Sequence, residues 1–139
     1  MTVSTNIHNI FIDTNVFIGA YANIKTDEKA LRFLYSLKGK RLFTSSLAIA
    51  QLASVFQKKK PNAQIKNIIK EICHRVNILS FSEKDIQEAL KIERSDIEDN
   101  IQYVISSKMK CGIIVTNNTK DFKNFFITPI KPQAITSVG

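Results

Sequence analysis

The chain has no tryptophan, only two cysteines and no long apolar run, and each absence narrows what it can be. Cys73 and Cys111 lie far apart and form no CxxC pair, which fits a reducing cytosol where each acts as a small buried hydrophobe. No segment is long and apolar enough to span a bilayer, and no signal peptide precedes the short apolar stretch Ile10–Ile12. We therefore expect a cytoplasmic protein with no membrane partner.

The aromatic residues are nine phenylalanines and three tyrosines, a composition that favours core packing over aromatic recognition surfaces. The adjacent Phe125 and Phe126 are accordingly expected to lie in the core or at a partner surface rather than to act as stacking platforms.

Acidic residues are scarce as well, because 12 Asp and Glu stand against 20 Lys and Arg and leave a net charge of +8. This balance favours a polyanionic partner, with nucleic acid ahead of a membrane surface, although basic charge can also serve solubility alone. A chain of 139 residues that is 44% hydrophobic is large enough to form one hydrophobic core. No repeat, low-complexity tract or linker interrupts it, so residues 1–139 are expected to form a single domain.

Short apolar runs alternate with segments of helical spacing along the whole chain, which predicts an α/β fold with a mostly parallel sheet of four to five strands, covered by helices on both faces. A doubly wound strand order of 3-2-1-4-5 makes the first and fourth strands neighbours. The predicted strands are Ile10–Ile12, Arg41–Thr44, Val76–Leu79, Ile113–Val115 and Ile127–Lys131, the last being an edge strand because it carries Pro129.

Two predicted helices bear on the later argument. The segment from Ser46 to Phe56 is apolar nearly all round, which predicts a deeply buried helix. The pattern Ser95-Asp96-Ile97-Glu98 is a capping box and predicts that a helix starts there and leads into the fourth strand.

Carboxylates follow the predicted strands at the edge of the sheet where ligands bind in open α/β folds. Asp13 comes directly after the first strand, Asp121 follows the fourth, and Asp96 and Asp99 open the helix between them. Taken singly, each can be a helix cap, a first-turn acid or a loop acid. Taken together, they repel one another unless a cation lies between them, and on a basic protein we expect a divalent metal that faces a phosphodiester.

Four segments in order, FIDTN (11–15), TSSLAIAQL (44–52), SDIEDNIQY (95–103) and IVTNNTKDF (114–122), give the chain its family likeness. The sequence resembles PIN domains, and more narrowly the toxin ribonucleases of VapC type. The resemblance implies a three-layer α/β/α sandwich and a metal-dependent endoribonuclease that uses Mg²⁺ or Mn²⁺. It also implies an RNA substrate, an antitoxin partner and a homodimer.

The resemblance assigns roles residue by residue. Asp13, Asp99 and Asp121 correspond to the first, third and fourth acidic metal ligands and would be the catalytic residues. The side chains that would orient ligands and water are Thr14, Asn15, Thr116 and Asn117.

One position departs from the family pattern, because Gln51 stands where the second acid, usually Glu, is expected. A glutamine carbonyl can bind magnesium, but it brings no charge and cannot act as a base. The site is therefore expected to bind metal more weakly, with one ion rather than two, unless Asp96 partly replaces the missing charge. The alternative is that Gln51 is a helix residue with no role in the site.

Three function classes follow from these features. The first is the metal-dependent ribonuclease, and the second is a weakly active or inactive PIN-like module that binds RNA or protein. The third, a phosphatase or receiver-like domain, is disfavoured because the third predicted strand ends in Leu79-Ser80-Phe81, without the acid that a receiver needs. Lys58, Lys59 and Lys60 are either solvated charge at a helix end or contacts to RNA phosphates.

Overall fold

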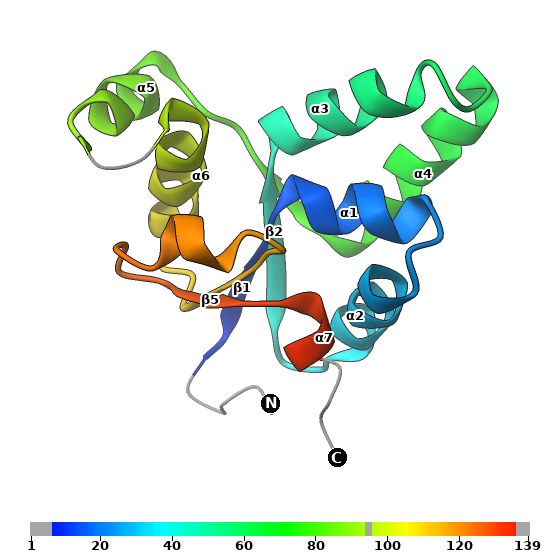
Figure 1. Ribbon diagram of the computed structural model, residues 1–139, viewed down its shortest axis with the longest axis horizontal. Helices are drawn as coiled ribbons and strands as arrows, with labels where there is room; N and C mark the ends of the chain where they lie inside the picture. The colour runs from blue at the N-terminus through cyan, green and yellow to red at the C-terminus, as the bar shows by residue number, and fades with distance from the viewer. Residues whose placement is uncertain (1–6, 94–95, 136–139) are drawn as a thin grey trace.

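The computed structural model describes residues 7–93 and 96–135 of the chain. Five strands form one sheet in the order β3-β2-β1-β4-β5, and every neighbouring pair is parallel (Figure 1). The predicted order is therefore confirmed. The strands are β1 (Asn9–Ile12), β2 (Arg41–Ser45), β3 (Asn77–Leu79), β4 (Ile113–Val115) and β5 (Thr128–Ile130).

Strands β1 and β4 are buried on both faces of the sheet. This explains why their sequences are continuous apolar runs rather than alternating apolar and polar residues. In β1 the side chains of Ile10 and Ile12 enter one core cluster, whereas Phe11 between them enters a second. Successive side chains of a strand point to opposite faces, so the two clusters lie on opposite sides of the sheet. Pro129 lies in β5 at the sheet edge, as predicted.

Helices cover both faces and complete the three layers (Figure 1). On one side, the core cluster around Ile10 and Ile12 draws on residues of five helices: α1 (Thr14–Tyr21), α2 (Lys25–Ser36), α3 (Ser46–Phe56), α4 (Asn62–Arg75) and α7 (Pro132–Ile135). On the other side, the cluster around Phe11 draws on α6 (Ile97–Lys108) and the short 3₁₀ helix η1 (Thr119–Phe122), with α5 (Glu83–Leu90) packed against α6. No helix in the described ranges is long and apolar enough to cross a bilayer.

Two predictions about burial are wrong. Helix α3 buries only the face that carries Ala48, Leu52 and Phe56, and Val55 is exposed because another face of the helix lines a cleft instead of the core. Cys73 is exposed on α4, whereas Cys111 is buried as expected. Burial raises the pKa of the Cys111 thiol to about 12, which keeps it protonated and unreactive near neutral pH.

Helices α5 and α6 hold each other through buried polar contacts, and this fixes the start of α6. Asp85 accepts hydrogen bonds from the backbone N–H and hydroxyl of Ser82 and pairs with the Lys108 ammonium. Burial alone would raise the pKa of Asp85, but the bonds from Lys108 and Ser82 outweigh it and hold that pKa below its usual value. At the other end, Asn100 Nδ2 donates to the carbonyls of Ala89 and Ile92.

The predicted capping box at the start of α6 includes Ser95, which lies outside the described residues. Asp96 is the N-cap of this helix, and its Oδ1 accepts a hydrogen bond from the Asp99 backbone N–H at 2.9 Å. The N-cap therefore lies one residue later than the predicted capping box places it, because Asp96 bonds to Asp99 at the third position of the helix.

Candidate active site

A cleft of about 410 Å³ lies where β1 ends and α1 begins. Helices α1, α3 and α6 surround the carboxyl end of the central strands, which is the upper edge of the sheet in Figure 1. Each helix contributes polar side chains, and those that line the cleft are Asp13, Thr14, Asn15, Gln51, Ser54, Glu98, Asp99, Gln102 and Asn118. The structure thus brings five sequence-predicted site residues into one cleft.

Asp13 is held in place by four donors. Its Oδ2 accepts from Thr116 Oγ1 at 2.7 Å and from Asn15 Nδ2 at 3.1 Å. Its Oδ1 accepts from the Thr14 backbone N–H at 2.7 Å and from Gln102 Nε2 at 3.4 Å. Burial raises the pKa of Asp13 even though the bonds from Thr116 and Thr14 act to lower it. Asp13 is also the N-cap of α1, so its capping role and its place in the cleft coexist.

A second layer of polar contacts fixes Asn15. The Asn117 backbone N–H donates to Asn15 Oδ1 at 3.2 Å, and Asn117 Nδ2 donates to Asp27 Oδ1 at 3.1 Å. Asp27 is only 3% exposed and packs directly against Gly19 of α1. A chain of contacts therefore runs from α2 through Asn117 and Asn15 to the Asp13 carboxylate.

Asp99 projects from α6 into the same cleft, where carboxylates gather and no Lys or Arg is among the described residues that line it. Partial burial, followed by the charges of Asp96, Asp121, Asp13 and Glu98, raises the pKa of Asp99 to about 7. A carboxyl group with this pKa is only partly ionised at neutral pH, and an approaching cation would favour its ionised form.

Asp121 lies next to this cleft rather than in it. It lines an adjoining hollow of about 210 Å³ on η1, together with Asn117, Lys120 and Lys131. Its charge nevertheless acts on Asp99 across the boundary between the two hollows. The structure thus brings Asp13 and Asp99 together and leaves Asp121 at the rim.

The carboxylates in the cleft have the ligand chemistry that a divalent cation requires. Asp13 and Asp99 offer hard oxygen ligands, and magnesium typically takes one or two carboxylates and completes its shell with water and substrate oxygens. Within residues 7–93 and 96–135, no three His, Cys, Asp or Glu side chains already stand close enough to enclose an ion. The donor set therefore suits an ion bound by two carboxylates better than a closed protein cage.

Gln51 occupies the cleft wall and joins α1 to α6. Its Oε1 accepts from Thr14 Oγ1 at 2.8 Å, and its Nε2 donates to Glu98. Glu98, rather than Asp96, is therefore the acid that contacts the position that lacks a carboxylate. Asp96 contributes to the negative charge around Asp99 but is engaged as a helix cap.

Replacing Gln51 by glutamate is expected to tighten Mn²⁺ binding by about 10-fold, because it adds a charged oxygen ligand beside Asp13 and Glu98. Isothermal titration calorimetry with Mn²⁺ measures this effect directly. Gln87→Glu, an equal change on the exposed face of α5, serves as the control and should leave the affinity unchanged. Equal affinities for the wild type and Gln51→Glu would mean that residue 51 does not face the ion.

Sequence reasoning missed Glu98, Gln102 and Asp27 as parts of this region. Glu98 and Gln102 stand at i and i+4 on α6, and this helical spacing places both on one side of the helix, toward the cleft. No comparable signal exists for Asp27, since its partner Asn117 comes from a distant loop. Lys58, Lys59 and Lys60 follow α3 and do not line the cleft, and Lys60 instead lies 5.1 Å from the Phe56 ring centre.

The hollow between α2 and α4 has no comparable chemistry. It measures about 350 Å³, and its two acids are already engaged, because Glu28 pairs with Arg32 and Glu71 accepts from the Tyr21 hydroxyl at 2.5 Å. The cleft at the end of β1 is therefore the candidate active site.

Comparison with known families identifies the family of the chain. The family model described as PIN domain matches residues 10–125. The chain belongs to the PIN domain family. This PIN domain is 27% identical over 137 residues to "Ribonuclease VapC1" of Aquifex aeolicus, a match that covers 91% of this chain and 90% of that protein.

Solved structures share the fold of this PIN domain at low sequence identity. A toxin-antitoxin complex from Klebsiella pneumoniae matches with a TM-score of 0.69 and 16% identity, covering 91% of this chain and 99% of that one. VapBC2 from Rickettsia felis, bound to a promoter DNA fragment, matches with a TM-score of 0.67 and 19% identity, covering 88% and 98%. VapC20 of Mycobacterium tuberculosis, described as a sarcin-ricin loop cleaving toxin, matches at 0.64 and 12%, covering 86% and 99%.

Proposed function

We propose that this PIN domain is an endoribonuclease that hydrolyses RNA phosphodiester bonds with the help of Mg²⁺ or Mn²⁺. The observation that supports it is the meeting of Asp13 and Asp99 in one cleft, where neighbouring carboxylates help to raise the pKa of Asp99 to about 7. On a chain with a net charge of +8, such a concentration of negative charge is suited to a metal ion with an anionic substrate.

Each side chain has a defined task in this proposal. Asp13 and Asp99 hold the ion, with Asp121 beside it, and the four donors around Asp13 keep its oxygens oriented before substrate arrives. A divalent ion bound there supplies charge stabilisation at the phosphate and lowers the pKa of water. Asp99 must release its proton before it can act as a ligand, which makes activity rise with pH through neutrality.

The decisive experiment is cleavage of a panel of single-stranded and structured RNAs with Mg²⁺, Mn²⁺ or EDTA. We expect cutting that needs metal, is lost in Asp13→Asn and is kept in Glu83→Gln, an exposed acid of α5 that serves as the control. Cutting that persists in both EDTA and Asp13→Asn would contradict the assignment of this site.

A second candidate function rests on Gln51, a neutral side chain in the cleft wall at the position where the family usually has a glutamate. In that case the PIN domain binds metal and RNA but does not cut. A folded preparation that binds both and cleaves no RNA in the panel favours this candidate over the ribonuclease.

We also propose that the protein is the toxin of a toxin–antitoxin pair and works in the cytoplasm as a homodimer. The supporting observation is that several proteins of similar fold were solved as toxin–antitoxin complexes. Residues 1–139 are proposed to form one PIN-like domain, since the family model spans most of the chain.

A further inference from the structure

Phe126 is exposed to an extent that is unusual for a phenylalanine. It lies between η1 and β5, and 97% of its surface is open to solvent. Its neighbour Phe125 belongs to the core side of the same loop and packs against the cluster around Phe11. Phe126 is therefore not a core residue, and an exposed large apolar side chain of this kind points to an interaction.

Two hollows flank Phe126. One measures about 490 Å³ and is also lined by Lys91 and Tyr103, and the other measures about 350 Å³ and is also lined by Lys110 and Tyr103. Phe126 and Tyr103 contribute to both hollows, so these two rings separate them. Both hollows therefore have an aromatic wall. In the first, Glu93 also lines the hollow and Lys91 pairs with Glu88, whereas in the second Lys110 is the charged residue of the lining.

The aromatic wall has a rigid base. Tyr103 stacks on Phe125, with ring centres 4.4 Å apart and planes inclined by 19°, and Phe125 in turn contacts the buried Phe122 at 5.8 Å between ring centres. A ring held in this way presents a fixed surface and loses little conformational freedom when a ligand stacks on it.

The acids and the aromatic wall follow one another along α6 and along the segment formed by η1 and the loop after it. Tyr103 follows Asp99 by one turn of α6, about 6 Å along the helix axis. Phe125 likewise follows Asp121 in the segment that begins with η1. A strand of nucleic acid that passes along α6 can therefore meet both the acidic cleft and the two hollows.

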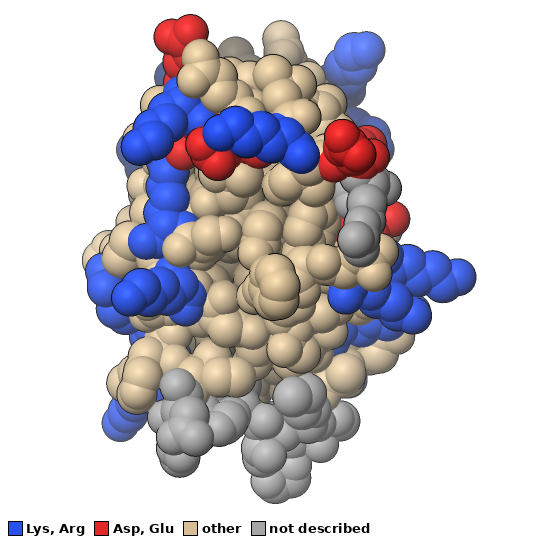
Figure 2. Space-filling model, turned by 90° about the vertical axis from the view of Figure 1, so that its left-hand side faces the viewer, with Lys and Arg blue, Asp and Glu red and all other residues tan. Residues whose placement is uncertain are grey.

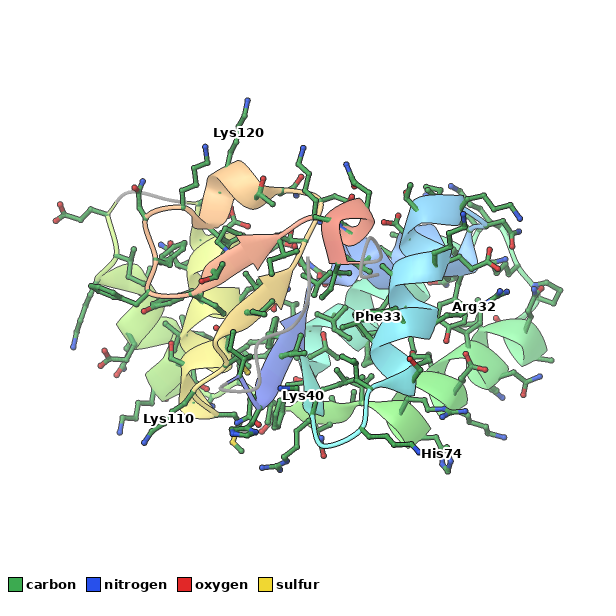
Figure 3. All side chains as sticks on the ribbon, turned by 90° about the horizontal axis from the view of Figure 1, so that it is seen from below. Arg32, Phe33, Lys40, His74, Lys110 and Lys120 are labelled. Atoms are coloured by element: carbon green, nitrogen blue, oxygen red, sulfur yellow. The ribbon has the colours of Figure 1, made fainter. Side chains whose placement is uncertain are left out.

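Basic side chains flank the two hollows. Figure 2 shows the side that carries α5, α6 and the loop after η1, where a broad uncharged area has Lys and Arg side chains on both flanks and Asp and Glu side chains along its upper edge. In Figure 3, Lys110 and Lys120 project outward from opposite edges of this half of the molecule. Protein–protein interfaces are depleted in lysine, whereas aromatic rings flanked by cations are typical of sites for single-stranded nucleic acid.

We propose, against the expectation from the aromatic composition, that Tyr103 and Phe126 form a binding site for two neighbouring bases of single-stranded RNA, one base in each hollow. Lys110, which lines the second hollow, lies beside the phosphate of one of these nucleotides. The inference rests on the proposed ribonuclease function and extends it, because it defines where the RNA lies beyond the bond that is cut and requires that this part be unpaired.

Binding of a short fluorescent single-stranded RNA, measured by anisotropy in EDTA so that no metal-dependent cutting occurs, tests the proposal. Phe126→Ala is expected to weaken binding by between about 5-fold and 100-fold, the effect of losing one stacked ring. Phe126→Leu should show a similar loss because leucine has no flat face, whereas Phe126→Tyr should bind as the wild type does.

Two further variants separate stacking from other effects. Leu90→Ala changes another exposed apolar side chain, one that lines neither hollow, and should leave binding unchanged. Lys110→Gln should reduce the slope of log affinity against log salt by about 0.7, the contribution of one phosphate contact on a single strand.

The outcomes distinguish this proposal from the proposed function. If the wild type cuts RNA and Phe126→Ala binds and cuts equally well, the base site is wrong and the ribonuclease stands. If Phe126→Ala leaves RNA binding unchanged but converts a dimer to a monomer in analytical ultracentrifugation, the surface binds a second protein chain and the proposal is overturned. Phe126-dependent binding without any cutting supports the base site and contradicts the ribonuclease.

Discussion

Replacing Asp99 by asparagine is expected to lower metal-dependent RNA cleavage by about 10²- to 10³-fold and, at pH 8, to make the metal-free protein more stable. The loss of activity follows because a carboxylate ligand of the ion becomes a neutral amide, and one lost electrostatic contact of this kind has effects of that size. The gain in stability follows because Asp99 is partly buried and surrounded by other carboxylates.

The sign of the pH effect follows from the raised pKa of Asp99. Its pKa is about 7 in the folded protein and about 3.9 in an unfolded chain. Between these values the folded state holds the extra proton, so its contribution to stability is full below pH 4 and is lost as pH rises through 7. The asparagine that replaces Asp99 in the variant does not titrate. Above pH 7 the variant should therefore exceed the wild type by about 1–2 kcal/mol, a figure reduced for solvent screening of this partly exposed group.

Urea denaturation at pH 5 and pH 8, with EDTA and with Mn²⁺, measures both effects. The metal-free wild type should lose stability between the two pH values, and Mn²⁺ should restore it in the wild type but not in the variant. Glu83→Gln, an exposed acid of α5, is the control and should show neither change. A variant that is less stable than the wild type at pH 8 without metal would refute the idea that burial and carboxylate repulsion raise the pKa of Asp99.

Replacing Gly19 by alanine is expected to destabilise the protein by about 2–3 kcal/mol and to slow cleavage by about 10-fold. A Cβ atom on Gly19 would stand 1.7 Å from Asp27 Oδ2 and 3.1 Å from the Asp27 Cβ, so the Asp27 side chain must turn away. Turning it breaks its bond to Asn117, which orients Asn15 beside Asp13. Overpacking and the broken buried contact outweigh the roughly 1 kcal/mol that alanine contributes in a helix.

Gly112 provides the matched control, because a Cβ atom there meets nothing closer than 3.4 Å and Gly112→Ala should be tolerated. The double variant Gly19→Ala with Asp27→Ala removes the clash as well as the carboxylate. It should therefore recover part of the stability lost in Gly19→Ala, a coupling that thermal denaturation of the four proteins in the cycle can measure. Strictly additive losses would show that the two residues do not oppose each other.

The parts of this molecule that the sequence predicted well are those encoded by local patterns. Buried parallel strands read as short apolar runs. The doubly wound order was one of the few that right-handed crossovers allow, and with that order Asp13 and Asp99 were expected at the same sheet edge. Thr116 and Asn117 were expected in the site only through the resemblance to PIN domains, and the structure brings them to Asp13 and Asn15.

Other features depend on distances that no local pattern contains. Asp27 enters the site region only because α2 packs on α1 and the loop after β4 folds over it. The loop after η1 turns Phe125 toward the core and leaves Phe126 exposed. The sequence does not show which of these two adjacent phenylalanines points inward. Asp121 was expected in the cleft and lies at its rim, because η1 turns it into the adjoining hollow.

The pairing of β1 with β4 determines when the protein can become active during its synthesis. The hydrogen bond between Asp13 and Thr116 joins residues 103 positions apart. At about 5–20 residues per second, a ribosome needs on the order of 5–20 s to make the intervening chain. Until then Asp13 has no β4 beside it, and the incomplete chain holds only part of the carboxylate cluster. During that time the chain is still attached to the ribosome, which consists largely of RNA.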